Sequence, residues 1–184
     1  KISFRINPGD MQDNSSNKRI INTDNIFDIN RIGSNDTFES GKSLTLGINY
    51  KKEANKTKNL TTNDINNFFE FSAATVFRDS SEKFMPTSST LNKKNSNLFG
   101  SIKNHYYSDD ESNLFESLKF DYYFSLDDKL ENLEYSSLVG ELSFNKLTTS
   151  FNLIEEKGPI GSTSTIENSF IYQFDELNYL SFST

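Results

Sequence analysis

The sequence predicts an all-β protein that forms part of an antiparallel transmembrane β-barrel, about eight or nine strands of a larger barrel. Two observations carry this prediction. Apolar residues alternate with polar ones along most of the 184 residues, and the chain is rich in aromatics (17 Phe and 8 Tyr) although only 34% of it is hydrophobic. No apolar run is long enough for a membrane helix, whereas a barrel strand needs apolar residues only at every second position.

The clearest predicted strand covers residues 114–126. Leu118, Phe120 and Tyr122 fall on one face, and Lys119 and Asp121 fall on the other. A transmembrane strand needs about 9–11 residues, so this segment is long enough to cross a bilayer. The same alternation predicts further strands over residues 2–6, 44–50, 69–77, 98–106, 138–144, 147–153, 166–174 and 177–184.

The connections between the predicted strands alternate in length. Residues 109–113, 145–146 and 175–176 are short, whereas 7–41, 78–95 and 155–162 are longer. Bacterial barrels have short periplasmic turns and long extracellular loops, so this parity predicts that the longer set is extracellular. The connection over 51–64 falls in the periplasmic set and is longer than that pattern predicts.

Composition argues against several function classes. The chain has no cysteine, so zinc–thiolate and disulfide chemistry are not expected, and its net charge of −7 argues against a nucleic-acid partner. No calcium-loop spacing occurs, and no serine or aspartate can be assigned to orient His105, the only histidine. We therefore expect no catalytic residues, no metal and no cofactor, and we do not expect an enzyme.

Charged residues on the polar faces of the predicted strands are candidates for the lining of a barrel lumen. Alternation places them on the face opposite the aromatic residues, where water would fill the barrel. The predicted lumen-facing residues are Lys103, His105, Lys119, Asp121 and Glu141.

Residues 25–41 carry a segment with an Asn-x-Phe start, then an arginine, then a run that ends in Glu-Ser-Gly. This segment resembles the LPS-assembly protein LptD (organic solvent tolerance protein) family, whose usual run is Gly-x-Asp-Arg-x-Glu-x-Gly before a strand. Ser34 and Thr37 depart from the family's glycine and arginine, and residues 77–100 resemble the family's next loop and returning strand. The positions that fit the family's pattern, for which we expect a structural role in a loop, are Arg31, Asp36, Glu39 and Gly41.

The resemblance implies a Gram-negative outer-membrane barrel that inserts lipopolysaccharide (LPS) into the outer leaflet. Its implied partners are LPS, outer-membrane lipid, an LptE-like lipoprotein plug and a periplasmic LPS-transport bridge. Because the sequence starts at Lys1 rather than Met, we expect residues 1–184 to be part of one barrel domain, with the family's N-terminal jellyroll and final strands outside them.

Two other interpretations are consistent with the same alternation of apolar and polar residues. Another outer-membrane porin or transporter would have the same strands without the segment at 25–41. A secreted β-sandwich of the adhesin type would also alternate, but its strands average only about 5–6 residues. A sandwich would bury the aromatic residues between two sheets, whereas a barrel would direct them outward to lipid.

Overall fold

The structure is a computed structural model that describes residues 1–54, 67–108, 116–175 and 178–184. It contains nine strands and one short 3₁₀ helix, η1. The strands are β1 (Ile2–Asn7), β2 (Gly41–Ala54), β3 (Asn67–Arg78), β4 (Leu98–Tyr107), β5 (Ser117–Leu126), β6 (Leu133–Phe144), β7 (Leu147–Glu156), β8 (Ser164–Gln173) and β9 (Tyr179–Ser183), and η1 spans Thr87–Ser89. The all-β fold class is confirmed.

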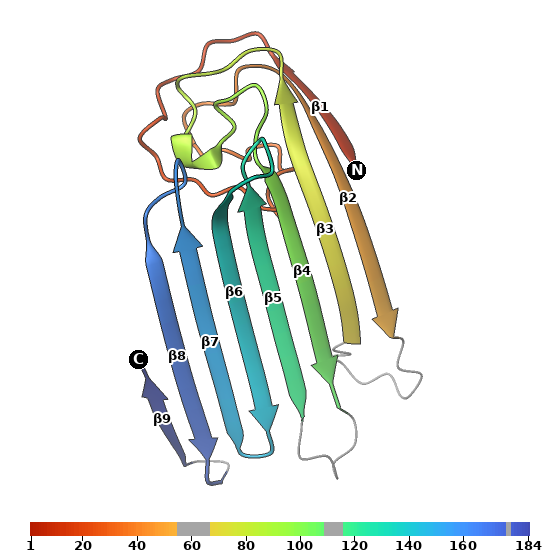
Figure 1. Cartoon of the computed structure of the whole chain (residues 1–184), viewed down its shortest axis with the longest axis vertical. Coiled ribbons are helices and arrows are strands. Elements are labelled where there is room, and N and C mark those ends of the chain that lie inside the picture. Colours follow the sequence, from red (N-terminus) through yellow and green to blue (C-terminus); the bar gives the residue numbers. More distant parts are fainter. Residues whose placement is uncertain (55–66, 109–115, 176–177) are drawn as a thin grey trace.

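All nine strands belong to one antiparallel sheet in which sequence neighbours are spatial neighbours, from β1 at one edge to β9 at the other (Figure 1). In the described part of the chain β1 pairs only with β2, and β9 pairs only with β8. The strands thus form a single open meander rather than the two packed sheets of a sandwich.

The register of the sheet gathers the alternating residues on two opposite faces. One rung of paired residues crosses the sheet from β2 to β8 and is apolar or aromatic throughout: Tyr50, Phe71, Ile102, Tyr122, Leu138, Leu153 and Ile166. The adjacent rung points the other way and is mostly charged or polar: Lys51, Glu70, Lys103, Asp121, Val139, Asn152 and Glu167. Because side chains alternate along a strand, each predicted apolar set shares one face of the sheet.

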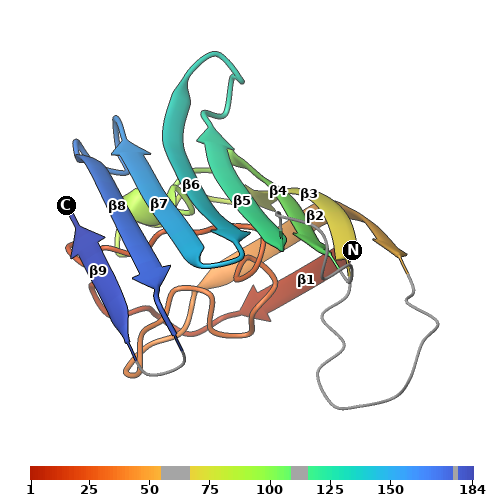
Figure 2. The same cartoon turned by 90° about the horizontal axis from the view of Figure 1, so that it is seen from below.

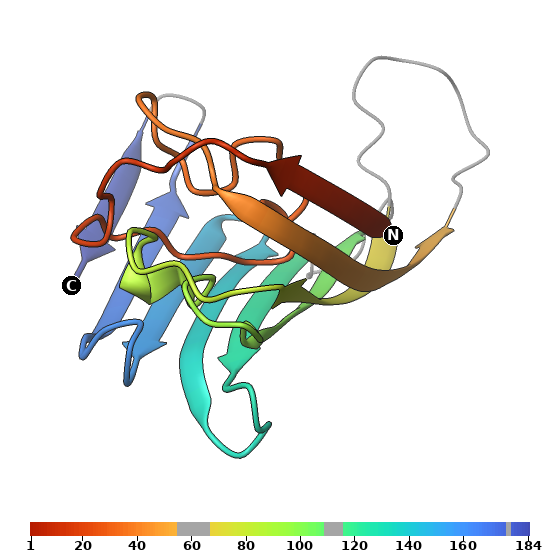
Figure 3. The same ribbon diagram turned by 90° about the horizontal axis from the view of Figure 1, so that it is seen from above.

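The sheet is curved, and the segment over residues 8–40 lies on its inner side (Figures 2 and 3). We call the face that carries Lys103 the concave face and the face that carries Tyr122 the convex face. On the convex face Ile48, Ile166 and Phe170 are 65%, 64% and 46% exposed. The aromatic residues of this face therefore do not meet a second sheet.

The buried core lies between the loops and one end of the concave face, where β2, β3 and β4 meet segments 8–40 and 79–97 (Figure 1). The loops contribute Ile21, Ile26, Ile32, Met85 and Leu91, and the sheet contributes Ala74, Val76 and Phe99. At this end of β3 and β4 the concave face is therefore apolar and not polar. The reason is that the loops bring their own apolar side chains, which exclude water and pair with apolar side chains of the strands.

Several strand bounds differ from those predicted. Strand β6 begins at Leu133, five residues before the predicted start, because residues 133–137 pair with β5 and β7 although their own alternation is weak. Strand β2 continues to Ala54, so the connection to β3 is shorter than predicted. The start of the predicted strand at 114–126, the turn at 109–113 and most of the connection over 51–64 lie outside the described residues.

The longer connections within the described part of the chain lie at one end of the sheet. Segments 8–40, 79–97, 127–132 and 157–163 join strands at that end, and the two-residue turn at 145–146 lies at the other (Figure 1). The antiparallel meander thus places the predicted longer set at one end, as the parity of the connections requires.

Two glycines leave room for aromatic rings on the convex face. A Cβ on Gly100 would lie 2.1 Å from the ring of Phe124, its partner on β5, and a Cβ on Gly140 would lie 2.2 Å from the ring of Phe151, its partner on β7. Each ring therefore covers backbone that would otherwise be bare. No helix within the described ranges is long and apolar enough to cross a membrane.

Candidate functional site

The five residues predicted to face a lumen lie together on the concave face. Lys103 pairs with Asp121 across β4 and β5, His105 pairs with Lys119 on the same two strands, and Lys119 pairs with Glu141 on β6. The structure therefore brings residues from three strands into one cluster, which the alternation alone could place only strand by strand. That this face borders a lumen stays a prediction.

His105 is held by contacts on two sides. Its Nε2 lies 2.8 Å from Oδ1 of Asp121, and both side chains are 16% exposed. Its ring packs against Phe68 of β3, with 4.4 Å between the ring centroids. With a carboxylate on one side and an aromatic ring on the other, His105 is a fixed part of the wall of the concave face.

Charges of opposite sign alternate along one rung of this face. Lys51, Glu70, Lys103 and Asp121 are successive cross-strand partners from β2 to β5. Opposite charges directly across a sheet attract, so each strand of this rung is stabilised by its neighbours. Asn49 donates to Glu70 (2.6 Å) and to Ser72 (2.8 Å), which adds a polar contact between β2 and β3. These four residues are two cations and two anions, so their charges balance from β2 to β5.

Asp24 of the loop over 8–40 reaches down to this charged rung. Its carboxylate accepts hydrogen bonds from Nζ of Lys103 (2.9 and 3.0 Å) and from the hydroxyl of Tyr123 (2.7 Å). Next to it, the hydroxyl of Thr23 donates to Ser101 of β4 (2.7 Å). Burial alone would raise the pKa of Asp24, but the bonds from Lys103 and Tyr123 outweigh burial and hold that pKa below its ordinary value.

Sequence reasoning did not identify Asp24. Its partner Lys103 is 79 residues away along the chain, and no local pattern joins them. Lys103 is predictable because it stands in a clear strand alternation, whereas Asp24 stands in an irregular segment without a period.

The segment over 25–41 and the end of β3 build a buried ion cluster at the loop end of the sheet. Arg31 is fully buried and forms a two-pronged contact with Glu39, with Nε–Oε2 at 2.7 Å and Nη2–Oε1 at 2.6 Å. Arg78, at the end of β3, binds the same Oε1 and donates to the carbonyl of Ser40 (2.5 Å). Two arginines thus share one carboxylate.

The remaining donors of Arg31 bind the concave face of β2. Its Nη1 donates to Thr45 (2.8 Å) and its Nη2 to Ser43 (3.0 Å). Both hydroxyls belong to buried residues, so they replace the water that the guanidinium loses on burial. Arg31 therefore ties the loop to β2, and Arg78 ties the same loop to β3.

The balance of burial and partners at Glu39 favours the ionised form. Burial by itself would raise the pKa of Glu39. The hydrogen bonds and positive charge of Arg31, together with the charge of Arg78, outweigh burial and hold that pKa below its ordinary range. Glu39 is therefore ionised at neutral pH, as the two arginines require.

Of the other segment positions, Gly41 has a clear conformational role and Asp36 does not. Gly41 has φ +80°, a conformation that disfavours a side chain, and a Cβ there would also lie 3.3 Å from Nη2 of Arg78. Asp36 is exposed, and within the described residues the structure gives no ion pair to its carboxylate. Arg31, Glu39 and Gly41 thus act together, and Arg78 joins them.

In the parts of the chain that the structure describes, no group of three or more His, Asp or Glu is placed to hold a metal ion. The two clusters are built from ion pairs and hydrogen bonds that fix loops onto strands. No protein-family model matches the chain, and no curated protein or solved structure is significantly similar to it.

Proposed function

We propose that the chain forms part of the wall of an outer-membrane β-barrel that delivers LPS to the outer leaflet. The barrel part of this proposal rests on the two adjacent rungs of paired residues described above. The convex rung from Tyr50 to Ile166 offers lipid an apolar surface, and the concave rung from Lys51 to Glu167 suits water. Lipid outside and water inside is the pattern of a transmembrane barrel.

Strand length supports the same proposal. Strands β2, β3 and β6 have 14, 12 and 12 residues, and β4, β5, β7 and β8 have 10 each. A tilted strand of about 9–11 residues crosses the hydrocarbon core of a bilayer. In lipid every backbone hydrogen bond must be satisfied within the protein, and a strand between two paired neighbours meets that requirement.

The LPS role within this proposal depends on the resemblance of residues 25–41 to the LptD family. The structure supplies a physical reason for that pattern, because Arg31 and Glu39 are partners in one buried cluster and Gly41 leaves room for Arg78. LPS has charged sugars and acyl chains. In this proposal the concave face carries the sugars and the acyl chains stay with lipid, so no covalent bond changes.

Cysteine scanning tests the barrel. The chain has no cysteine, so each introduced thiol is unique. In proteoliposomes, Phe120→Cys and Ile166→Cys on the convex face should resist a charged maleimide, and a fluorophore attached there under denaturing conditions should be quenched by nitroxide-labelled lipid after refolding. The matched concave variants Lys119→Cys and Glu167→Cys should react in water and escape quenching. The reverse pattern would overturn the barrel.

A second measurement tests the LPS role. LPS carrying a photoactivatable group on its sugars should crosslink to Lys119 and Glu141 in the protein from its native membrane. Depletion of the protein should keep newly made LPS from reaching the cell surface. An LPS-modifying enzyme that cannot cross the outer membrane should then leave that LPS unmodified. Normal surface LPS after depletion, with lipid quenching intact, would favour a porin or transporter of another substrate.

A further inference from the structure

Lys103 and Tyr123 form a pair of hydrogen-bond donors on the concave face. Lys103 stands on β4, and Tyr123 follows its cross-strand partner Asp121 by two positions on β5. Nζ of Lys103 donates to both carboxylate oxygens of Asp24 (2.9 and 3.0 Å), and the Tyr123 hydroxyl donates to one of them (2.7 Å). Hydrogen bonds to a charged group are stronger than those between neutral groups. The two donors therefore hold one anionic group between them.

The acidic residues beside Lys103 on the sheet have other partners. Glu70 and Asp121 are its cross-strand neighbours on β3 and β5. Glu70 accepts a hydrogen bond from Asn49 (2.6 Å), and Asp121 lies 2.8 Å from Nε2 of His105. The carboxylate bonded to Lys103 therefore comes from the loop, although two others lie on neighbouring strands.

The turn that carries Asp24 is held together by bonds of its own. Oδ1 of Asn22 accepts hydrogen bonds from N of Asp24 (3.0 Å) and N of Asn25 (3.2 Å). N of Ile26 donates to O of Asn22 (3.1 Å). Ile21 and Ile26, on either side of the turn, are 1% and 0% exposed. The backbone of the turn is therefore fixed without the carboxylate of Asp24.

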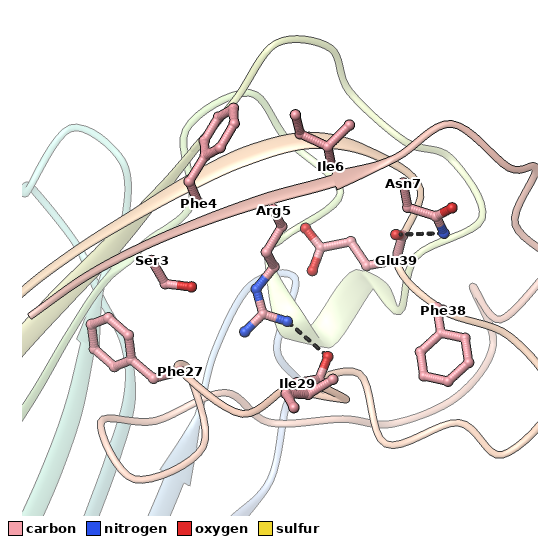
Figure 4. Close-up of a pocket in the computed structure, with 9 residues that line it drawn as sticks. All are labelled: Ser3, Phe4, Arg5, Ile6, Asn7, Phe27, Ile29, Phe38 and Glu39. Carbon is pink, nitrogen blue, oxygen red and sulfur yellow. Dashed lines mark hydrogen bonds between the residues drawn. The ribbon is translucent and has the colours of Figure 1, made fainter.

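Strand β1 anchors the chain that follows this turn. Nη1 of Arg5 donates to the carbonyl of Ile29 (2.8 Å), and Nη2 donates to that of Asp28 (2.5 Å). Figure 4 shows the side chain of Arg5 reaching from β1 to Ile29. The loop is thus held on both sides of Asp24 by contacts in which its carboxylate takes no part.

Asp24 covers the two donors only through its side chain. That side chain is 53% exposed, whereas the side chain of Lys103 is 17% exposed. Rotation of the Asp24 carboxylate into water uncovers both donors without a movement of the backbone. Phosphate and carboxylate groups both offer anionic oxygens to a cation and a hydroxyl, so either group on a ligand can take the place of this carboxylate.

We propose that Lys103 and Tyr123 form a binding site for an anionic oxygen group of LPS, a phosphate or a sugar carboxylate, with Asp24 as its internal competitor. This inference rests on the proposed function, in which the charged sugars of LPS lie along the concave face. A competitor within the chain lowers the apparent affinity in proportion to the fraction of molecules in which it has turned away. Its removal should tighten binding by up to about fivefold, the factor that an exposed ion pair supplies.

The affinity for labelled LPS, measured on the complete protein in its native membrane lipid, tests the proposal. Asp24→Ala should bind LPS up to about fivefold more tightly than the wild type. Asp24→Ala combined with Lys103→Gln should lose that gain. Glu156→Ala removes one negative charge from the same face at the end of β7 and should leave the affinity unchanged. Unchanged affinity in Asp24→Ala, or an equal gain in Glu156→Ala, would overturn the proposal.

LPS from which the phosphates have been removed identifies the bound group. A gain in Asp24→Ala that persists with this LPS assigns the site to a sugar carboxylate. A gain that disappears assigns the site to a phosphate. Circular dichroism of each variant checks that the sheet is intact.

Protection of Lys103 from acetylation separates the site from the proposed function, because this measurement needs no LPS. In Asp24→Ala, inorganic phosphate should slow the acetylation of Lys103 by an amine-reactive reagent, and Tyr123→Phe in the same background should weaken that protection. Acetylation of the exposed Lys129 should not change. Protection without a gain in LPS affinity would overturn the assignment to LPS, and a lack of protection would overturn the site. The lipid-quenching experiment above tests the barrel independently of these outcomes.

Discussion

The two halves of the sheet share one alternating pattern but differ in burial. At the loop end of β2–β4 the concave face is dry: Thr45 and Val76 are fully buried and Phe99 is 1% exposed. On β8, by contrast, Ile171 on the same face is 41% exposed. The alternation therefore decides which face a residue occupies, and the loops decide whether that face meets solvent.

Connection length accounts for the difference. Segments 8–40 and 79–97 join strands of the first half and are long enough to fold back over the concave face, whereas residues 145–146 and 157–163 of the second half are too short. The covered half is fixed by the cluster of Arg31, Glu39 and Arg78. We therefore expect substitutions in the covered half to cost stability that matched substitutions in the open half do not.

The largest expected effect is that of Glu39→Ala. It would leave two arginines without their carboxylate, and breaking a buried ion pair by removing one partner costs about 3–5 kcal/mol. Urea unfolding in detergent, followed by circular dichroism, measures this loss. In the open half Glu155→Gln breaks the exposed Glu155–Lys157 pair (2.8 Å) and should change the free energy of unfolding by less than about 1 kcal/mol. Equal effects would contradict the comparison.

Leu91→Ala should cause the second largest loss of stability. Leu91 is fully buried in the loop core, and truncating a buried leucine costs about 2–5 kcal/mol because it leaves a cavity. Leu180→Ala on β9, where the side chain is 63% exposed, is the matched control and should cost no more than about 0.5 kcal/mol. Hydrogen exchange resolved by segment should show faster exchange over 79–97 in Leu91→Ala and unchanged exchange in β8. A uniform increase would mean that the two halves unfold as one unit.

Lowering the pH should destabilise the packing of segments 8–40 and 79–97 on the sheet before it affects the open half. The pKa of Glu39 is lower in the folded protein than in the unfolded chain, so its contribution is complete above the ordinary glutamate value of about 4.3 and is lost as pH falls through the folded value. Glu82, whose pKa is lowered by a hydrogen bond from Ser40, acts in the same direction.

We expect amide hydrogen exchange over residues 8–40 to become faster below pH about 4. The increase should be smaller than in Glu39→Ala, because a protonated Glu39 carboxyl still accepts a hydrogen bond. Glu39→Gln should reduce this pH dependence and leave that of β7 and β8 as it was. An unchanged pH profile in Glu39→Gln would show that another group carries the effect.

Asp24→Asn should have a smaller effect than Glu39→Ala or Leu91→Ala. It weakens the contacts to Lys103 and Tyr123, but Asp24 is itself half-exposed, so the cost should be about 1 kcal/mol or less. Faster exchange confined to residues near Asp24 would confirm that this carboxylate fixes the loop locally. Tyr123→Phe, which removes one of the two partners, should have a smaller effect in the same place.

The sequence was informative where a short period governs structure. Alternation alone assigns Phe120 and Lys119 to opposite faces of the sheet. The register of the strands then aligns each face with the corresponding faces of the neighbouring strands. Strand ends were less predictable: Leu133 joins β6 because two neighbours offer it hydrogen-bond partners, not because of its own pattern. Of the two clusters, the segment over 25–41 indicated Arg31 and Glu39, but nothing in it indicated that Arg78 shares their carboxylate.

Residue order by itself determined the strand-rich fold and the division of side chains into two faces, because a period of two is a local property of the extended chain. Only the tertiary structure decided which part of the concave face is dry, since that depends on where Ile26 and Leu91 come to rest. The contacts of Asp24 with Lys103 and of Arg78 with Glu39 join residues 79 and 39 positions apart. Such contacts arise only when the strands pair and the loops fold back, because no local period encodes them.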